Sequence, residues 1–193
     1  EKKTVEDVTK DFERRREERR RVENGWLLNM NFLSGNQYCD VSPFGGIEQE
    51  DKRFFWQSRR VFNHIAPLVD SRVAKLLQRK PSLRVRAFSD EEGDVKAAKL
   101  ATGILRYVQD RVGLNGISSR VTTWAEICGS AFFKVDWDTV GGRQVAVDEQ
   151  GKPVYEGEVR VSAVPPFEIF PDRLDAEDVG DLYSIIHARA VPV

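Results

Sequence analysis

The feature that most constrains this chain is a change of hydrophobic period at Gly129. Before this residue, apolar side chains recur three and four positions apart, which is the period of a helix buried along one side. After it, apolar and polar side chains alternate, beginning with the run 131–137, which is the period of a half-buried strand. Helices followed by strands that turn back on one another predict an α+β fold, in which the helices pack with an antiparallel β-meander.

Four helices are expected before Gly129. They occupy residues 4–34, 54–80, the stretch between a capping box at 89–92 and Gly113, and about 115–128. Pro67 should kink or split the second helix because proline lacks a backbone donor. Pro81 should end that helix and lead into a short strand at 82–88.

The meander is expected to consist of strands at 131–137, 143–148, 154–163 and 183–191. The Gly141-Gly142 pair predicts a tight hairpin turn between the first two strands. Residues 165–172 contain too many prolines for a central strand.

The first helix has an apolar seam that two arginines interrupt. Val5, Val8, Phe12, Val22, Trp26 and Leu33 share one alternating spacing, and Arg15, Arg19 and Asn29 lie on the same line. A lone charge cannot be buried in a dry core. We therefore expect the middle of this helix to project from the domain or to meet acidic groups of a neighbouring subunit.

The charge of the chain argues against tight binding of nucleic acid. Thirty basic and thirty-one acidic side chains give a net charge of −1, whereas affinity for phosphate needs a local excess of Lys and Arg. The run 13–21 interleaves Arg with Glu, which predicts a solvated helix surface or a subunit contact in preference to DNA binding. Arg79, Lys80, Arg84 and Arg86 form a basic patch that reads as a solvated strand face.

Two further clusters have a structural and a functional interpretation. Phe54, Phe55 and Trp56 are expected to pack in the core, with a subunit contact as the alternative. Asp136 and Asp138 share a strand face and could bind Mg²⁺, with Glu168, Asp172 and Asp175 as further ligands. Aspartate beside a hairpin turn is common for turn chemistry alone, so the metal site is the weaker interpretation.

No recognised catalytic motif occurs in the sequence. His64 and His187 lack partners at a metal-ligand or nucleophile spacing, and the Gly45-Gly46 pair lacks the Lys of a phosphate-binding loop. Cys39 and Cys128 read as reduced thiols, and no apolar stretch approaches the length of a membrane span. We expect no catalysis, no cofactor, no metal and no membrane contact.

The order of several motifs resembles the portal proteins of short-tailed, double-stranded DNA phages. The resemblance covers about residues 24–190 and lies in the segments 26–38, 63–81, 97–107, 129–135 and 164–172. Its individual carriers are Trp26, Phe32, Gly35, Gln37, Tyr38, Asn63, Pro67, Pro81, Gly129, Phe132, Pro166, Pro171 and Asp172.

This resemblance implies a ring-shaped homo-oligomer, usually a dodecamer, at one vertex of the virion capsid, assembled in the host cytoplasm. It implies roles in DNA packaging, DNA ejection and head–tail joining. The implied partners are a terminase, capsid and scaffolding proteins, a tail adaptor, and double-stranded DNA in the channel. Residues 1–25 would form a charged helical extension and residues 26–193 a wing-like domain, helical to 129 and β-rich from 130. Stem, clip and crown segments are not recognised, so we expect a fragment of a longer portal and name no DNA contact.

Two other classes of function stay open from sequence. One is a metal-dependent nuclease or other DNA-processing enzyme that uses Asp136 and Asp138. The other is a non-viral adaptor whose charged first helix forms a coiled coil, which predicts that residues 1–25 alone dimerise.

Overall fold

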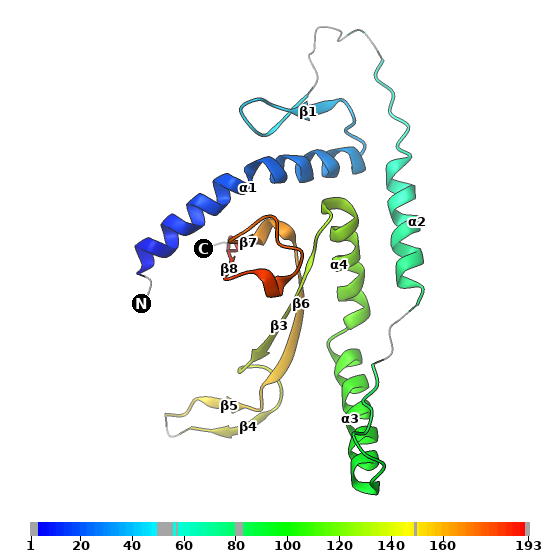
Figure 1. Ribbon diagram of the computed structural model, residues 1–193, viewed down its shortest axis with the longest axis vertical. Helices are drawn as coiled ribbons and strands as arrows, with labels where there is room; N and C mark the ends of the chain where they lie inside the picture. Colours follow the sequence, from blue (N-terminus) through cyan, green and yellow to red (C-terminus); the bar gives the residue numbers. More distant parts are fainter. Residues whose placement is uncertain (1–3, 50–55, 57, 80–82, 149, 192–193) are drawn as a thin grey trace. The chain divides into compact units, whose positions relative to one another are not determined.

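The computed structural model describes residues 4–49, 56, 58–79, 83–148 and 150–191. Its α-helices are α1 (Val5–Leu33), α2 (Ile65–Leu77), α3 (Glu92–Arg111) and α4 (Leu114–Cys128). Its strands are β1 (Cys39–Val41), β2 (Ile47–Gln49), β3 (Phe132–Asp138), β4 (Gln144–Val147), β5 (Pro153–Tyr155), β6 (Glu158–Val164), β7 (Ile169–Pro171) and β8 (Ile185–His187) (Figure 1). The predicted α+β class, with a long first helix, is confirmed.

The chain divides into two compact units. Unit 1 consists of Glu1–Val73, Thr123–Ala131 and Val164–Val193, and unit 2 consists of Ala74–Thr122 and Phe132–Ala163. In unit 1, α1 lies between the β1–β2 hairpin and the β7–β8 pair, and it contacts β1, β2 and β7 (Figure 1).

The strands form four separate pairs instead of the single meander expected from sequence. The pairs are β1–β2, β3–β6, β4–β5 and β7–β8. The predicted hairpin between β3 and β4 is therefore wrong. Strand β3 pairs with β6, and the β4–β5 hairpin is an insertion in the sequence between these two paired strands. The turn that contains Gly141 leads into this insertion, and the Gly141 carbonyl accepts a hydrogen bond from the Gly157 amide at 3.1 Å.

Capping interactions mark both ends of helix α1. Thr4 is the N-cap, and its side chain forms a reciprocal capping box with Asp7. At the other end, Gly35 has a φ of 94°, a conformation that glycine adopts without steric cost. Its amide donates to the Phe32 carbonyl at 3.1 Å and so satisfies one of the last carbonyls of the helix.

Helix α2 starts later than predicted, and Pro67 does not kink it. The helix begins at Ile65, so Pro67 lies in its first turn, where a backbone donor has no partner inside the helix. The Asn63 side-chain oxygen accepts hydrogen bonds from the amides of Ile65 and Ala66 at 3.1 and 3.2 Å. Asn63 therefore caps this helix, whose predicted first residue was Phe54.

Residues 83–88 are extended but do not form the predicted strand. The Val85 amide donates to the Thr102 hydroxyl at 3.1 Å, so a side chain of α3 takes the place of a strand partner. The predicted capping box at 89–92 is also wrong, because the N-cap is Glu91 and Ser89 bonds Asp94 instead. Pro81, at the proposed helix end, lies outside the described residues.

Candidate functional site: the arginine anchor and the apolar face of β3

The arginines that interrupt the apolar seam of α1 are buried within the chain, so the expectation that this part of the helix projects is wrong. Arg15 and Arg19 are only 4% and 2% exposed. We call these two residues the arginine anchor. They avoid the cost of a buried lone charge because their donors meet carbonyl and carboxylate oxygens of the same unit.

Arg15 has a partner for each of its five donors. Its Nη1 donates to the carbonyls of Phe170 and Ser184, both at 3.0 Å. Its Nη2 donates to the Ser184 hydroxyl at 2.6 Å and to Asp11 Oδ2 at 2.7 Å, and Nε donates to Asp11 Oδ1 at 3.2 Å. One guanidinium therefore joins α1 to β7 and to the residue before β8.

Arg19 performs the same role for the proline-rich segment that precedes β7. Its Nη1 donates to the carbonyl of Pro166 at 3.0 Å and to that of Ile169, and its Nη2 donates to the carbonyl of Phe167 at 2.9 Å and to Glu23. Within the described residues, its Nε has no hydrogen-bond partner. The guanidinium carbon also lies 3.7 Å from the centre of the Phe170 ring, a cation–π contact.

Aromatic contacts flank the arginine anchor on the same face of α1. The ring centres of Phe12 and Phe170 are 4.7 Å apart, and those of Trp26 and Phe167 are 5.2 Å apart. Trp124 of α4 contacts Phe167 from another side, with ring centres 6.1 Å apart. Apolar and charged members of the seam therefore contact one continuous segment, which includes residues 166–170.

Several motif residues of the predicted resemblance lie together where α1 ends. The side-chain amide of Asn63 donates to the Leu33 carbonyl at 2.7 Å. The residue that caps α2 therefore also forms a hydrogen bond with the last turn of α1. A Cβ on Gly35 would lie 3.6 Å from the same amide nitrogen. Nearby, the Arg59 guanidinium lies 5.2 Å from the centre of the Tyr38 ring.

The remaining motif residues occupy two parts of unit 1 and the start of β3. Pro166 is fully buried beneath Arg19, and Pro171 pairs with Ile185 across the β7–β8 pair. One carboxylate oxygen of Asp172 accepts from the Tyr183 amide at 3.1 Å. Gly129 ends α4 with a φ of 79°, and Phe132 opens β3. Gln37 is half-buried, and its backbone amide donates to the Gly35 carbonyl at 3.1 Å.

The aromatic cluster expected at the start of the second helix is only partly described. Phe54 and Phe55 lie outside the described residues. Trp56 is exposed, and it precedes α2 instead of belonging to it.

Unit 2 presents an apolar face that the chain leaves exposed. Phe133, Val135 and Trp137 alternate along one face of β3 and are 51%, 67% and 60% exposed. In the β4–β5 hairpin, Val145 and Val147 are also exposed. Exposed apolar side chains in a row along one strand are typical of a protein–protein contact.

The carboxylates considered as metal ligands do not converge. Asp138 accepts a hydrogen bond from the Val140 amide at 3.0 Å, which is turn chemistry. Glu168 contacts His187 at 3.1 Å instead of the Asp pair of β3. Within the part of the chain that the structure describes, no group of three or more His, Cys, Asp or Glu side chains could hold a metal ion. Among the same residues, no helix is long and apolar enough to cross a membrane.

Comparison with known proteins assigns the family. The sequence model described as "Phage P22-like portal protein" matches residues 46–185, which is well over half of the chain. No match was found among curated proteins or among solved structures. The resemblance that the motifs predict is therefore confirmed: the chain belongs to the P22-like phage portal proteins, structural proteins of the head–tail connector at the capsid vertex.

Proposed function

We propose that this protein is a ring subunit that acts in DNA packaging, DNA ejection and head–tail joining. The observation that carries the proposal is the family match over residues 46–185. The ring is a dodecamer in the virion, assembled in the host cytoplasm. Residues 26–193 form a wing-like domain of the subunit, and residues 1–25 form its helical extension.

The partners that this function requires are a terminase, capsid and scaffolding proteins, a tail adaptor, and double-stranded DNA in the channel of the ring. Hydrolysis of ATP belongs to the terminase in this scheme, so the subunit itself catalyses no reaction. The net charge of −1 agrees with a protein that surrounds DNA without binding its phosphates tightly through these residues.

A neighbouring subunit covers the apolar face of β3 in the proposed ring. Phe133, Val135 and Trp137 expose apolar area that water solvates unfavourably, and burying it supports association. A closed ring needs a head-to-tail contact between two different surfaces, and an exposed strand face can supply one of them.

The coiled-coil alternative disagrees with the contacts that α1 makes within unit 1. A coiled coil of residues 1–25 would place Phe12, Arg15 and Arg19 in its seam. These side chains instead contact residues of the segment 166–184 within unit 1. The middle of the face that would form the coiled coil, from Phe12 to Arg19, is therefore already occupied.

Packaging by complementation tests the proposed function. Phage that lack the gene should form capsids without DNA, and the wild-type gene supplied in trans should restore packaged DNA, measured as nuclease-protected genome per capsid. The double variant Asp136→Asn/Asp138→Asn should restore packaging to the same level, whereas a nuclease that uses these carboxylates would lose function. Normal packaging without the gene would contradict the proposal.

A further inference from the structure

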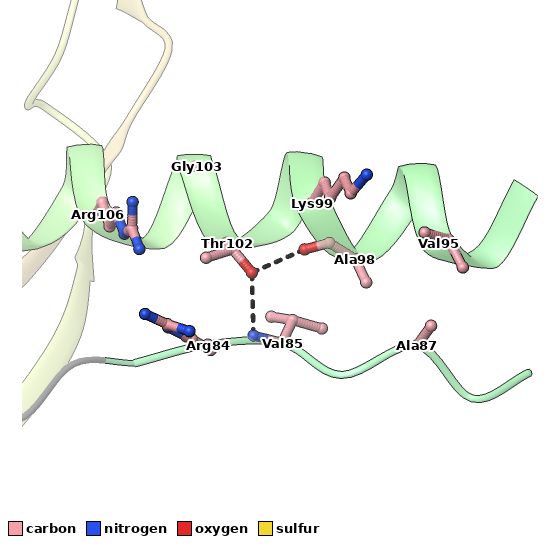
Figure 2. Close-up of a pocket in the computed structure, with 9 residues that line it drawn as sticks. All are labelled: Arg84, Val85, Ala87, Val95, Ala98, Lys99, Thr102, Gly103 and Arg106. Carbon is pink, nitrogen blue, oxygen red and sulfur yellow. Dashed lines mark hydrogen bonds between the residues drawn. The ribbon is translucent and has the colours of Figure 1, made fainter. Parts of the chain in front are cut away.

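Unit 2 contains an open groove of about 530 Å³ between the extended residues 83–88 and α3. Figure 2 shows the hydrogen bond that joins its two sides, in which the Val85 amide donates to the Thr102 hydroxyl at 3.1 Å. Within α3, the same hydroxyl donates to the Ala98 carbonyl at 2.8 Å, which orients its oxygen. Val85 and Ala98 also belong to its apolar lining, with Ala87 and Val95. We call this feature the basic groove because of its remaining side chains.

Three cationic side chains line the basic groove. Arg84 and Arg106 lie at the same end, one on each side, and Lys99 projects from α3 (Figure 2). Among the described residues, no carboxylate lies within ion-pair distance of any of the three. By contrast, Arg111 at the end of the same helix pairs with Glu158. Neighbouring cations repel one another, so the groove favours a ligand that brings carboxylates together with apolar side chains.

The chain itself carries a segment with this chemistry. The stretch 172–181 of unit 1 contains five carboxylates and one cation, in the sequence Asp-Arg-Leu-Asp-Ala-Glu-Asp-Val-Gly-Asp. Two of its apolar side chains, Leu174 and Val179, are 51% and 59% exposed. We call residues 173–179, which hold three of these carboxylates, the acidic segment.

The acidic segment is bent: Asp175 pairs with Arg173 at 3.0 Å, and Val179 begins the 3-10 helix Val179–Asp181. From Val95 to Arg106, α3 rises about 16 Å along the groove. The bent segment would therefore meet part of the groove, with Leu174 over the apolar lining and carboxylates beside Arg84 and Arg106.

We propose that the acidic segment of one ring subunit binds in the basic groove of a second copy of this chain. This inference rests on the proposed ring and specifies one of its subunit contacts. The groove and the segment are two different surfaces, which is what a head-to-tail ring contact needs. Opposite charges orient the approaching subunits, and the apolar side chains exclude water from the contact.

Charge reversal tests this contact in the complete gene product. The groove variant is Arg84→Glu/Arg106→Glu, the segment variant is Asp175→Lys/Glu177→Lys, and the control is Lys96→Glu/Lys152→Glu, which reverses exposed charges of unit 2 outside the groove. Ring formation is followed by native mass spectrometry and negative-stain imaging at about 150 mM salt, where exposed charges more than about 8 Å apart are largely screened. Circular dichroism verifies that each variant is folded.

Each charge-reversed variant alone should raise the protein concentration for half-assembly at least about tenfold, while the control assembles like the wild type. An equal mixture of the groove and segment variants should form rings again, because each altered surface then meets its complement on the neighbouring copy. Normal assembly of either variant alone overturns the proposal. Rescue only when all four substitutions are on one chain, and not in the mixture, would assign the contact within a subunit and also overturn it. If the wild type forms no ring, the proposed function itself fails.

Discussion

Replacing Arg19 with Met should destabilise unit 1 strongly, although the substitution keeps most of the apolar stem. The change removes the donors that satisfy the carbonyls of Pro166, Phe167 and Ile169. A buried carbonyl without a partner costs about 1–3 kcal/mol, and breaking a buried charged pair costs about 3–5 kcal/mol. We expect a loss of about 3–5 kcal/mol, which is a large part of a typical stability of about 5–15 kcal/mol.

Equilibrium unfolding in urea measures this loss. The fluorescence of Trp26 and Trp124 reports on the region because both rings contact Phe167. The midpoint should fall while the dependence on urea stays the same, since the variant and the wild type expose the same amount of surface when they unfold. Arg16→Met is the matched control: it changes an exposed side chain on the same helix and should alter stability by less than about 0.5 kcal/mol.

An Arg19→Met midpoint equal to that of the Arg16→Met control would refute the role given to the arginine anchor. It would mean that water or relaxed backbone satisfies the carbonyls of the segment 166–169 equally well. Arg19→Lys should be intermediate, because an ammonium has one charge centre and cannot match the planar fork of a guanidinium.

Three further outcomes follow from local contacts. Asn63→Ala should cost about 1–2 kcal/mol in urea unfolding by removing the cap of α2, and a cost below about 0.3 kcal/mol would contradict this. Gly157→Ala should cost at least about 1–2 kcal/mol, because φ is +77° and a Cβ would lie 2.6 Å from the Trp137 ring; Gly93→Ala, with nothing within 4 Å, should be neutral or stabilising. Burial raises the pKa of the Cys128 thiol, so less thiolate is present at pH 8 and alkylation by iodoacetamide, followed by peptide mass spectrometry, should be slower than for an unfolded control peptide.

The change of period at Gly129 was sufficient to predict the fold class, because the hydrophobic patterns of helices and strands relate residues only two to four positions apart in the sequence. The pairing of strands was not predictable in the same way. A meander and an inserted hairpin have the same alternation, and the long-range pairing of β3 with β6, closed by the hydrogen bond between Gly157 and Gly141, distinguishes them.

The burial of Arg15 and Arg19 could not be predicted for a different physical reason. The sequence shows Arg15 and Arg19 on an apolar line, and the expected partners were carboxylates of a neighbour. The structure instead provides backbone carbonyls from residues more than 140 positions away. A signal was present: within residues 165–172 only Ile169–Pro171 pairs with another strand, so the carbonyls of the prolines and aromatic residue before it need donors from side chains.

The mass of the assembled protein is the most direct test of the central claim. Native mass spectrometry of the complete gene product, with negative-stain imaging of the same sample, should give closed rings of about a dozen subunits. A protein that stays a monomer or a dimer over the concentrations at which capsids assemble would contradict the proposed portal function.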